Sequence, residues 1–380
     1  MKFSKIVHIN WAVLLLLLFF ITEAYFKIIW FSKGETPVLL QVTKGIILVG
    51  LTSYLLIKNQ KQIYLLGLLF VFFSIGQLTL ASSFPRSILI AFSKLMFPIV
   101  LLLFFSTSKL TNTQKKLFFN IFEYIILFNS LVILIGFLFD IKIFNTYSHF
   151  GVRFGYNGLI VTSATSSYVY SITLVYLLSK YKKAVFKKIP NLIIIFSMFF
   201  IGTKVSYLLL FSFFAIFIWI YTKINKRKLV CFFLIFGILF IYLFFFKVGI
   251  FNQIRQTDGL MSSLMSYRDV LFLKRTIPYI KEHWNIVNYL FGGVSDITTK
   301  SQIEFIDIFY FFGFLGGGLY YYLFFKAFLS FKTNVYIYIL LSILFIIVLL
   351  AGNLFGYPSI AIYTVILREH LKYNERNKDT

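Results

Sequence analysis

The stretch Leu229–Lys247, LVCFFLIFGILFIYLFFFK, is continuous apolar sequence that ends in one lysine. A helix of this length crosses the roughly 30 Å of hydrocarbon in a bilayer. Val335–Gly352, VYIYILLSILFIIVLLAG, has the same character. Neither stretch alternates between apolar and polar residues, as a strand of a membrane β-barrel would. We therefore predict an all-α, polytopic integral membrane protein.

The composition of the whole chain supports this prediction. Of its 380 residues, 59% are hydrophobic and only 13% are charged, whereas a soluble domain is about half apolar and about a quarter charged. We expect one membrane domain over residues 1–380 with about twelve spans. We place them at 10–31, 38–57, 63–81, 87–106, 117–139, 159–179, 189–203, 205–222, 229–249, 303–329, 335–352 and 354–368. The seventh span is short, and we expect Pro358 to interrupt the last one.

The net charge of +24 is concentrated in short clusters between apolar runs, such as KYKKAVFKK at 180–188 and KINKRK at 223–228. This placement is typical of cytoplasmic loops and not of a nucleic-acid-binding protein. The same bias predicts that both termini are cytoplasmic. Lys2 and Lys5 precede an apolar run without a cleavage site, so we expect a retained first span. The single Cys231 excludes an intrachain disulfide.

One connection, 249–302, is longer and more polar than the others and lies outside the cytoplasm on this topology. Its segment SYRDVLFLKRTIPYIKEHWNIVNYLFGG has helical spacing with an aromatic face. Connections this long in compact proteins are usually functional or disordered. The helical spacing predicts an ordered extracytoplasmic cap.

Two carboxylates stand out in a chain with only thirteen acidic residues. Glu304 and Asp307, in TKSQIEFIDIFYFFGFLGGG at 299–318, are three residues apart and share one face of a helix. The helix dipole alone would favour Glu304. Asp307 lies deeper among apolar residues, where an ionisable group is costly and marks a functional site.

Several cations are predicted to lie near the same membrane surface, namely Arg153, Lys204, Arg255, Arg268 and Arg275. Arginine binds phosphate bidentately and stabilises charge on a leaving group. A nearby carboxylate can take a proton from an attacking hydroxyl. The four histidines lack metal-ligand spacing, and no nucleotide, protease or hydrolase motif is present. The residues therefore predict a transferase site for a polyanion, with no metal and no cofactor.

Three stretches, together with the layout of spans and the late outer loop, resemble the bacterial O-antigen and capsular polysaccharide polymerases of the O-antigen polymerase and ligase superfamily. GVRFGYNGLIVTSA at 151–164 is similar to an arginine-containing segment of that family. FIGTKVSYLLL at 200–210 is similar to its Gly-Thr-Lys hairpin. SYRDVLFLK and YLFGG, followed by IEFIDIFYFFGFLGG, resemble its loop arginine, glycine turn and acidic helix start. The resemblance covers about the C-terminal two-thirds of the chain.

The resemblance implies a glycosyltransferase of the bacterial cytoplasmic (inner) membrane that works on its outer face. It would transfer a growing glycan from undecaprenyl diphosphate onto a lipid-linked repeat unit. Arg153 and Arg268 would hold diphosphate with help from Lys204, and Glu304 or Asp307 would be the base. The predicted substrate-binding set is completed by Arg255, Arg275, Tyr156, Asn157 and Tyr267. A flippase and a chain-length regulator would be partner proteins, and no nucleic acid is expected.

Two other functions remain open from the sequence. A ligase-type transferase of the same superfamily would carry a histidine near Glu304, which this chain lacks. A flippase or transporter of lipid-linked oligosaccharides would use charges inside its spans. Four such charges, Glu23, Lys44, Lys94 and Glu123, either pair with one another or line a pathway.

Overall fold

The computed structural model of the chain describes residues 10–35, 38–80, 84–147, 153–223, 225–247 and 249–376. The predicted flanking Lys2 and Lys5 lie outside these residues. The described chain is helical throughout, and its single β-bridge joins Asn145 to Tyr156. The helices are α1 (Trp11–Lys33), α2 (Val38–Lys58), α3 (Gln60–Leu78), α4 (Arg86–Thr107), α5 (Asn112–Leu138), α6 (Ser163–Tyr181), α7 (Ile189–Ser197), α8 (Lys204–Tyr221), α9 (Lys226–Tyr242), α10 (Gly249–Met265), α11 (Arg268–Leu271), α12 (Ile277–His283), α13 (Ile286–Phe291), α14 (Glu304–Phe328), α15 (Val335–Ala351) and α16 (Pro358–Arg376). The prediction of an all-α fold is confirmed.

Six of the described helices are long and apolar enough to cross a membrane, namely α1, α3, α4, α5, α8 and α14. This number fits a multi-pass membrane protein, but it does not support the predicted count of about twelve spans. Two further apolar helices, 189–200 and α15, are shorter than these six, and α15 with its 17 residues is at the lower end of the length of a membrane span. Helix α6 contains the polar run SATSSYVYS, which lowers its hydropathy. Pro358 begins α16 and does not interrupt it, because proline suits a first helical turn.

Polar side chains cap the ends of the apolar helices. At the start of α5, the Thr111 hydroxyl accepts a hydrogen bond from the backbone N–H of Gln114 at 3.2 Å. The Gln114 side chain in turn accepts one from the backbone N–H of Thr111 at 3.0 Å. The two hydrogen bonds form a capping box. Asn10 caps α1 and Thr203 caps α8 in the simpler way, through one side-chain oxygen. These caps satisfy backbone donors that an apolar solvent would leave unpaired.

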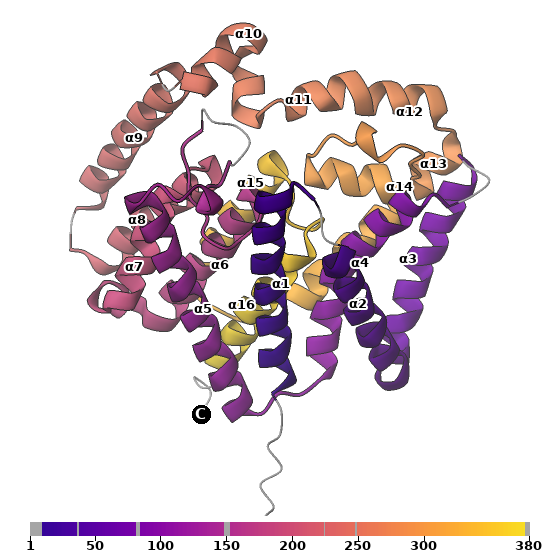
Figure 1. The fold of residues 1–380 in the computed structure, drawn as a ribbon, viewed down its shortest axis with the longest axis horizontal. Helices are drawn as coiled ribbons and strands as arrows, with labels where there is room; N and C mark the ends of the chain where they lie inside the picture. The colour runs from indigo at the N-terminus through magenta and orange to yellow at the C-terminus, as the bar shows by residue number, and fades with distance from the viewer. Residues whose placement is uncertain are drawn as a thin grey trace, which may run out of the picture.

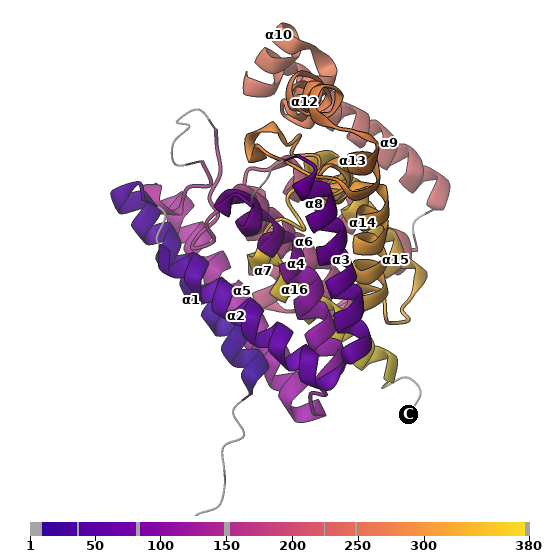
Figure 2. The ribbon, with the colours of Figure 1, turned by 90° about the vertical axis from the view of Figure 1, so that its right-hand side faces the viewer.

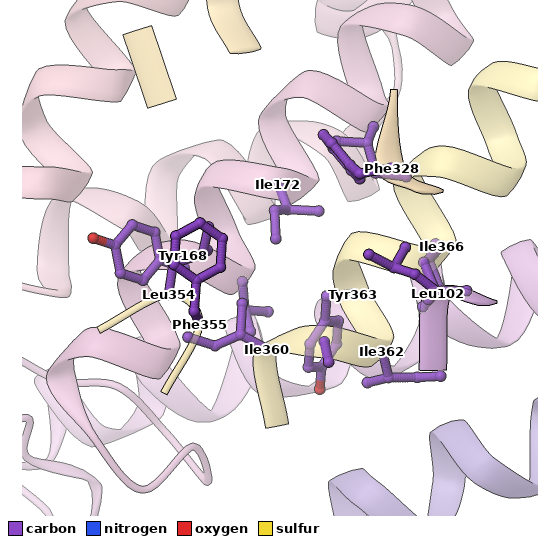
Figure 3. Close-up of a cluster of buried hydrophobic side chains, with 14 of the residues drawn as sticks. Leu102, Tyr168, Ile172, Phe328, Leu354, Phe355, Ile360, Ile362, Tyr363 and Ile366 are labelled. Atoms are coloured by element: carbon purple, nitrogen blue, oxygen red, sulfur yellow. The ribbon is translucent and has the colours of Figure 1, made fainter. Parts of the chain in front are cut away.

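The C-terminal helix α16 lies at the centre of the bundle. Its side chains are buried from Pro358 to Leu371, and Ile360, Tyr363 and Ile366 pack between residues of α4, α6 and α14 (Figure 3). The fully buried Arg368 donates to the Leu102 carbonyl at 2.7 Å and pairs with Glu369 at 2.5 Å. Burying this charge is tolerable because its donors are satisfied.

Residues 249–302 form a layer of short helices, α10 to α13, that lies across one end of the bundle (Figures 1 and 2). We call this layer the cap. The C-terminal end of α16 lies at the opposite end (Figure 1). Helix α9, which precedes the cap, extends along the outside of the bundle (Figures 1 and 2).

Three glycines attach the cap to the bundle. A Cβ on Gly76 of α3 would meet the backbone of Phe291 and Gly292, and a Cβ on Gly313 would meet the same segment from α14. Gly292 and Gly313 have φ of 75° and 67°, which favours glycine. The buried Asn288 donates to the Gly76 carbonyl at 2.9 Å. The chain at 290–293 is therefore held between α3 and α14.

We predict that Gly76→Ala loosens the cap. The added methyl would meet backbone and not a flexible side chain, so we expect a loss of about 1–3 kcal/mol of stability. Gly67 lies in the same helix with open space around it, so Gly67→Ala is the matched control and should be neutral or slightly stabilising. Thermal unfolding and limited proteolysis within 249–302 measure the difference. Equal behaviour of the two variants would contradict this attachment.

Candidate functional site

Three of the predicted cations come together beneath the cap. The guanidinium carbon of Arg153 lies 5.4 Å from the ring centroid of Tyr147 and 5.5 Å from that of Phe251. The Lys204 ammonium lies 3.9 Å from the centroid of the same Phe251 ring. The charges of Arg153 and Arg268 both act on Lys204. We call Arg153, Lys204 and Arg268 the arginine cluster.

The pKa of Tyr147 is affected by the charge of this cluster. Burial raises the pKa of the Tyr147 hydroxyl, while the positive charges of Arg153 and Arg268 act in the opposite direction. Cations concentrated around a partly buried phenol make a site that attracts anions. Tyr147 and Phe251 were not predicted as site residues, because an aromatic residue in an aromatic-rich chain gives no signal of its own.

A strained turn places Arg268 in the cluster. Ser266 and Tyr267, directly before it, have φ of 54° and 66°, which non-glycine residues rarely adopt. The Arg268 guanidinium donates to the Met265 carbonyl at 3.1 Å. Its Nε atom is buried and has no hydrogen-bond partner among the described residues. Backbone strain of this kind is concentrated at functional sites.

The predicted carboxylates begin α14. Glu304 is 5% exposed, and its Oε1 accepts from the Gly356 N–H at 2.8 Å. Its Oε2 is buried with no hydrogen-bond partner in the described part of the chain. Asp307 Oδ1 accepts from both the N–H and the hydroxyl of Ser301, each at 2.8 Å. Glu304 therefore keeps an unused oxygen, whereas Ser301 holds Asp307.

Both carboxylates line a cavity of about 550 Å³ between the cap and the bundle. This volume is in the range of pockets that bind small organic ligands. The cap contributes Val294, Ile297 and Lys300 to the lining. Further charged residues of the lining come from α1, α2 and α4, namely Glu23, Lys44, Arg86 and Lys94.

Arg268 and Tyr357 connect the arginine cluster to the cavity. Burial lowers the pKa of Arg268, and the negative charges of Glu304 and Asp307 oppose this shift. Burial raises the pKa of Tyr357, a cavity-lining residue, with Glu304 adding to the shift and Arg268 opposing it. Arg268 stays charged because the guanidinium is intrinsically so basic. Arg268 therefore acts on the same carboxylates that line the cavity, while the three residues of the arginine cluster do not themselves line it.

Five other predicted site residues have different surroundings. The Tyr156 hydroxyl donates to Asp140 at 2.7 Å, and the fully buried Asn157 accepts from the ammonium of Lys27. Asn157 thus contacts α1 through Lys27, and Tyr156 contacts Asp140 just after α5. The remaining three lie elsewhere in the cap: Arg255 stacks on Phe246 at 4.4 Å, Arg275 acts on Asp296, and Tyr267 is 40% exposed. None of the five lines the cavity.

The charges that the sequence left unassigned divide into two kinds. Glu23 pairs with Lys44 at 2.9 Å, and Glu123 pairs with Lys180. Lys94 makes no ion pair among the described residues, and it faces the cavity. Arg86 and Lys300 were not predicted as site residues, because a cation at a helix start or in a loop usually faces solvent.

No protein-family model, no curated protein and no solved structure matches the chain. The arrangement of side chains is therefore the evidence from which a function must be argued.

Lys204 has a clear role inside the protein. Its ammonium donates to the Ser263 carbonyl, to the Leu264 carbonyl at 3.3 Å and to the Ser266 hydroxyl at 3.1 Å. It therefore ties the turn before Arg268 to the start of α8.

We predict that Lys204→Met exposes this turn. Hydrogen bonds to a charged donor are worth about 1.5–3 kcal/mol, so hydrogen exchange of the 262–268 amides should accelerate roughly tenfold to hundredfold. The attachment at 290–293 does not involve Lys204, so its exchange is the internal control. Unchanged exchange at 262–268 would show that Lys204 does not hold the turn.

Proposed function

We propose that this chain is a polysaccharide repeat-unit polymerase of the bacterial cytoplasmic membrane. It would transfer a growing glycan from undecaprenyl diphosphate onto a lipid-linked repeat unit at the outer face of that membrane. The observation that carries the proposal is that Arg268 of the arginine cluster acts on the two carboxylates that line the cavity under the cap, one of which has a buried oxygen with no partner among the described residues. The bundle supplies a membrane location, and the cap faces the extracytoplasmic side.

In this reaction Arg153 and Arg268 bind the diphosphate of the donor, and Lys204 holds the turn that carries Arg268. A hydroxyl of the acceptor attacks the anomeric carbon of the donor glycan, and the bond from that carbon to the diphosphate oxygen breaks. The electron pair leaves with undecaprenyl diphosphate, and Arg153 and Arg268 stabilise the charge that develops there. The proton of the attacking hydroxyl passes to a carboxylate.

Glu304 is the better candidate for that proton acceptor. Its Oε1 is held by the Gly356 N–H, which fixes the carboxylate, and its Oε2 has no partner in the described chain. Asp307 has one oxygen engaged twice by Ser301. We therefore assign Asp307 to shaping the site beside Glu304.

We predict that Glu304→Gln abolishes polymer without disturbing the fold. The amide oxygen can still accept from Gly356, but the side chain no longer takes a proton, so the transfer rate should fall by about 10² to 10⁴. The measurement is the electrophoretic ladder of surface polysaccharide in a deletion strain that carries the variant gene. Arg268→Gln should likewise collapse the ladder to single repeat units.

Glu282→Gln is the matched control, because Glu282 is exposed on the cap and does not line the cavity. It should leave the ladder unchanged. A normal ladder in the Glu304→Gln strain, with the variant present in the membrane, would rule out Glu304 as the base.

The second candidate function is a flippase for the same lipid-linked oligosaccharides. It is favoured by the charged cavity, which extends along α4 from Arg86 to Phe97, about 16 Å at the usual helical rise. If the chain is a flippase, deletion of its gene should remove even single repeat units from the cell surface. Retention of single repeat units in that strain would exclude this function.

A further inference from the structure

The cavity is lined by a group of cations separate from the arginine cluster, whose own three residues do not line it. Arg86 and Lys94 lie two helical turns apart on one face of α4, and Lys300 extends from the cap. All three are exposed to the cavity or its mouth, and none makes an ion pair in the described part of the chain. We call Arg86, Lys94 and Lys300 the basic wall.

The basic wall is electrostatically costly as it stands. Lys94 lies within an apolar membrane helix, where a lysine is unfavourable unless it meets water or a counter-charge. The positive charges of Lys300 and Lys44 both act on Lys94 and repel it. Lys94 is exposed and lines the cavity, so water or a bound anion in the cavity can offset this cost.

The carboxylates of the cavity only partly compensate for these cations. Glu23 is engaged by Lys44 at 2.9 Å and by the hydroxyl of Ser359. The positive charge of Lys300 acts on Glu304 and Asp307, but neither carboxylate forms an ion pair with Lys300. Lys94 and Arg86 are thus left facing space that can hold a ligand.

We propose that the basic wall binds an oxyanion of the acceptor, which makes the acceptor an anionic repeat unit. This inference rests on the proposed function. The oxyanion is either the carboxylate of an acidic sugar or a phosphate of the acceptor's own lipid linkage. Both present oxygens that an ammonium or a guanidinium binds through charge-assisted hydrogen bonds.

We assign this wall to the acceptor because the proposed donor site, the arginine cluster, does not line the cavity, whereas the basic wall does. Arg268 and Lys300 both act on Glu304 and Asp307, one from the arginine cluster and the other from the basic wall. With the donor diphosphate in the arginine cluster and the base at Glu304, the cavity that Glu304 lines is the space left for the acceptor and its attacking hydroxyl. A group anchored at Lys94 would hold the acceptor there.

Binding to the purified full-length protein in lipid nanodiscs tests the proposal by titration calorimetry. The first probe is a tetrasaccharide that contains glucuronate, compared with its carboxyl-reduced neutral counterpart. The second probe is farnesyl diphosphate. The variants are Lys94→Gln and Lys300→Gln, and the control is Lys274→Gln, an exposed cation of the cap that does not line the cavity.

We expect Lys94→Gln and Lys300→Gln each to weaken binding of one probe by about tenfold or more, with the control unchanged. Weaker binding of the glucuronate tetrasaccharide, together with poor binding of its neutral counterpart, supports an acidic sugar. Weaker binding of farnesyl diphosphate in the basic-wall variants supports a phosphate of the acceptor lipid. Two independent variants guard against one that fails to fold.

Three results would overturn the proposal. In the first, neither probe binds the wild type. In the second, both probes bind the wild type and the basic-wall variants equally. In the third, Arg268→Gln alone weakens the binding of farnesyl diphosphate, while no variant changes the binding of the tetrasaccharide. The assay also separates this inference from the proposed function. If the Glu304→Gln strain keeps its ladder, the polymerase mechanism is excluded, but binding of the probes at Lys94 is unaffected. If the ladder collapses while the probes bind wild type and basic-wall variants equally, only the acceptor site is excluded.

Discussion

The cost of an unpaired charge in an apolar bundle governs the arrangement of this protein. Each ionisable side chain inside the helices must find a counter-charge, a set of hydrogen bonds or water. At the end away from the cap, Arg368, Glu369 and Lys115 form a closed buried network, with Lys115 at 2.8 Å from Glu369. Toward the cap, Glu23 and Lys44 form a pair at the cavity wall. Lys94, in α4, has no ion pair in the described part of the chain and lines that cavity.

The same constraint explains how the cap and the bundle share the site. The arginine cluster takes Arg268 from the cap, Arg153 from the segment after α5 and Lys204 from the start of α8. The cavity takes Lys300 from the cap and its carboxylates from α14. The glycine contacts at Gly76, Gly292 and Gly313 keep these parts in register, because backbones that approach so closely leave little room to slide.

Strained backbone accompanies the site. Among the described residues, six besides glycine have positive φ, and four of them, Ser266, Tyr267, Gln302 and Asn353, flank Arg268, Glu304 or the loop that contacts Glu304. Each such residue costs of order 1–3 kcal/mol and persists only where surrounding contacts enforce it. None of these four positions is a glycine, so the local sequence does not indicate the positive φ values. This clustering supports the same location for the site as the charges do.

The sequence by itself determined the membrane character and the helical fold, because apolar runs are local properties of the chain, and the rarity of carboxylates in those runs drew attention to Glu304 and Asp307. It also predicted Arg153, Lys204 and Arg268, which the structure brings together. Only the tertiary structure decided that Tyr156 and Asn157 serve internal contacts and that Arg255 lies apart. It alone placed Lys94, Arg86 and Lys300 on one wall, since their convergence depends on how α4 packs beneath the cap. Periodicity cannot encode a distance between segments that lie 200 residues apart in sequence.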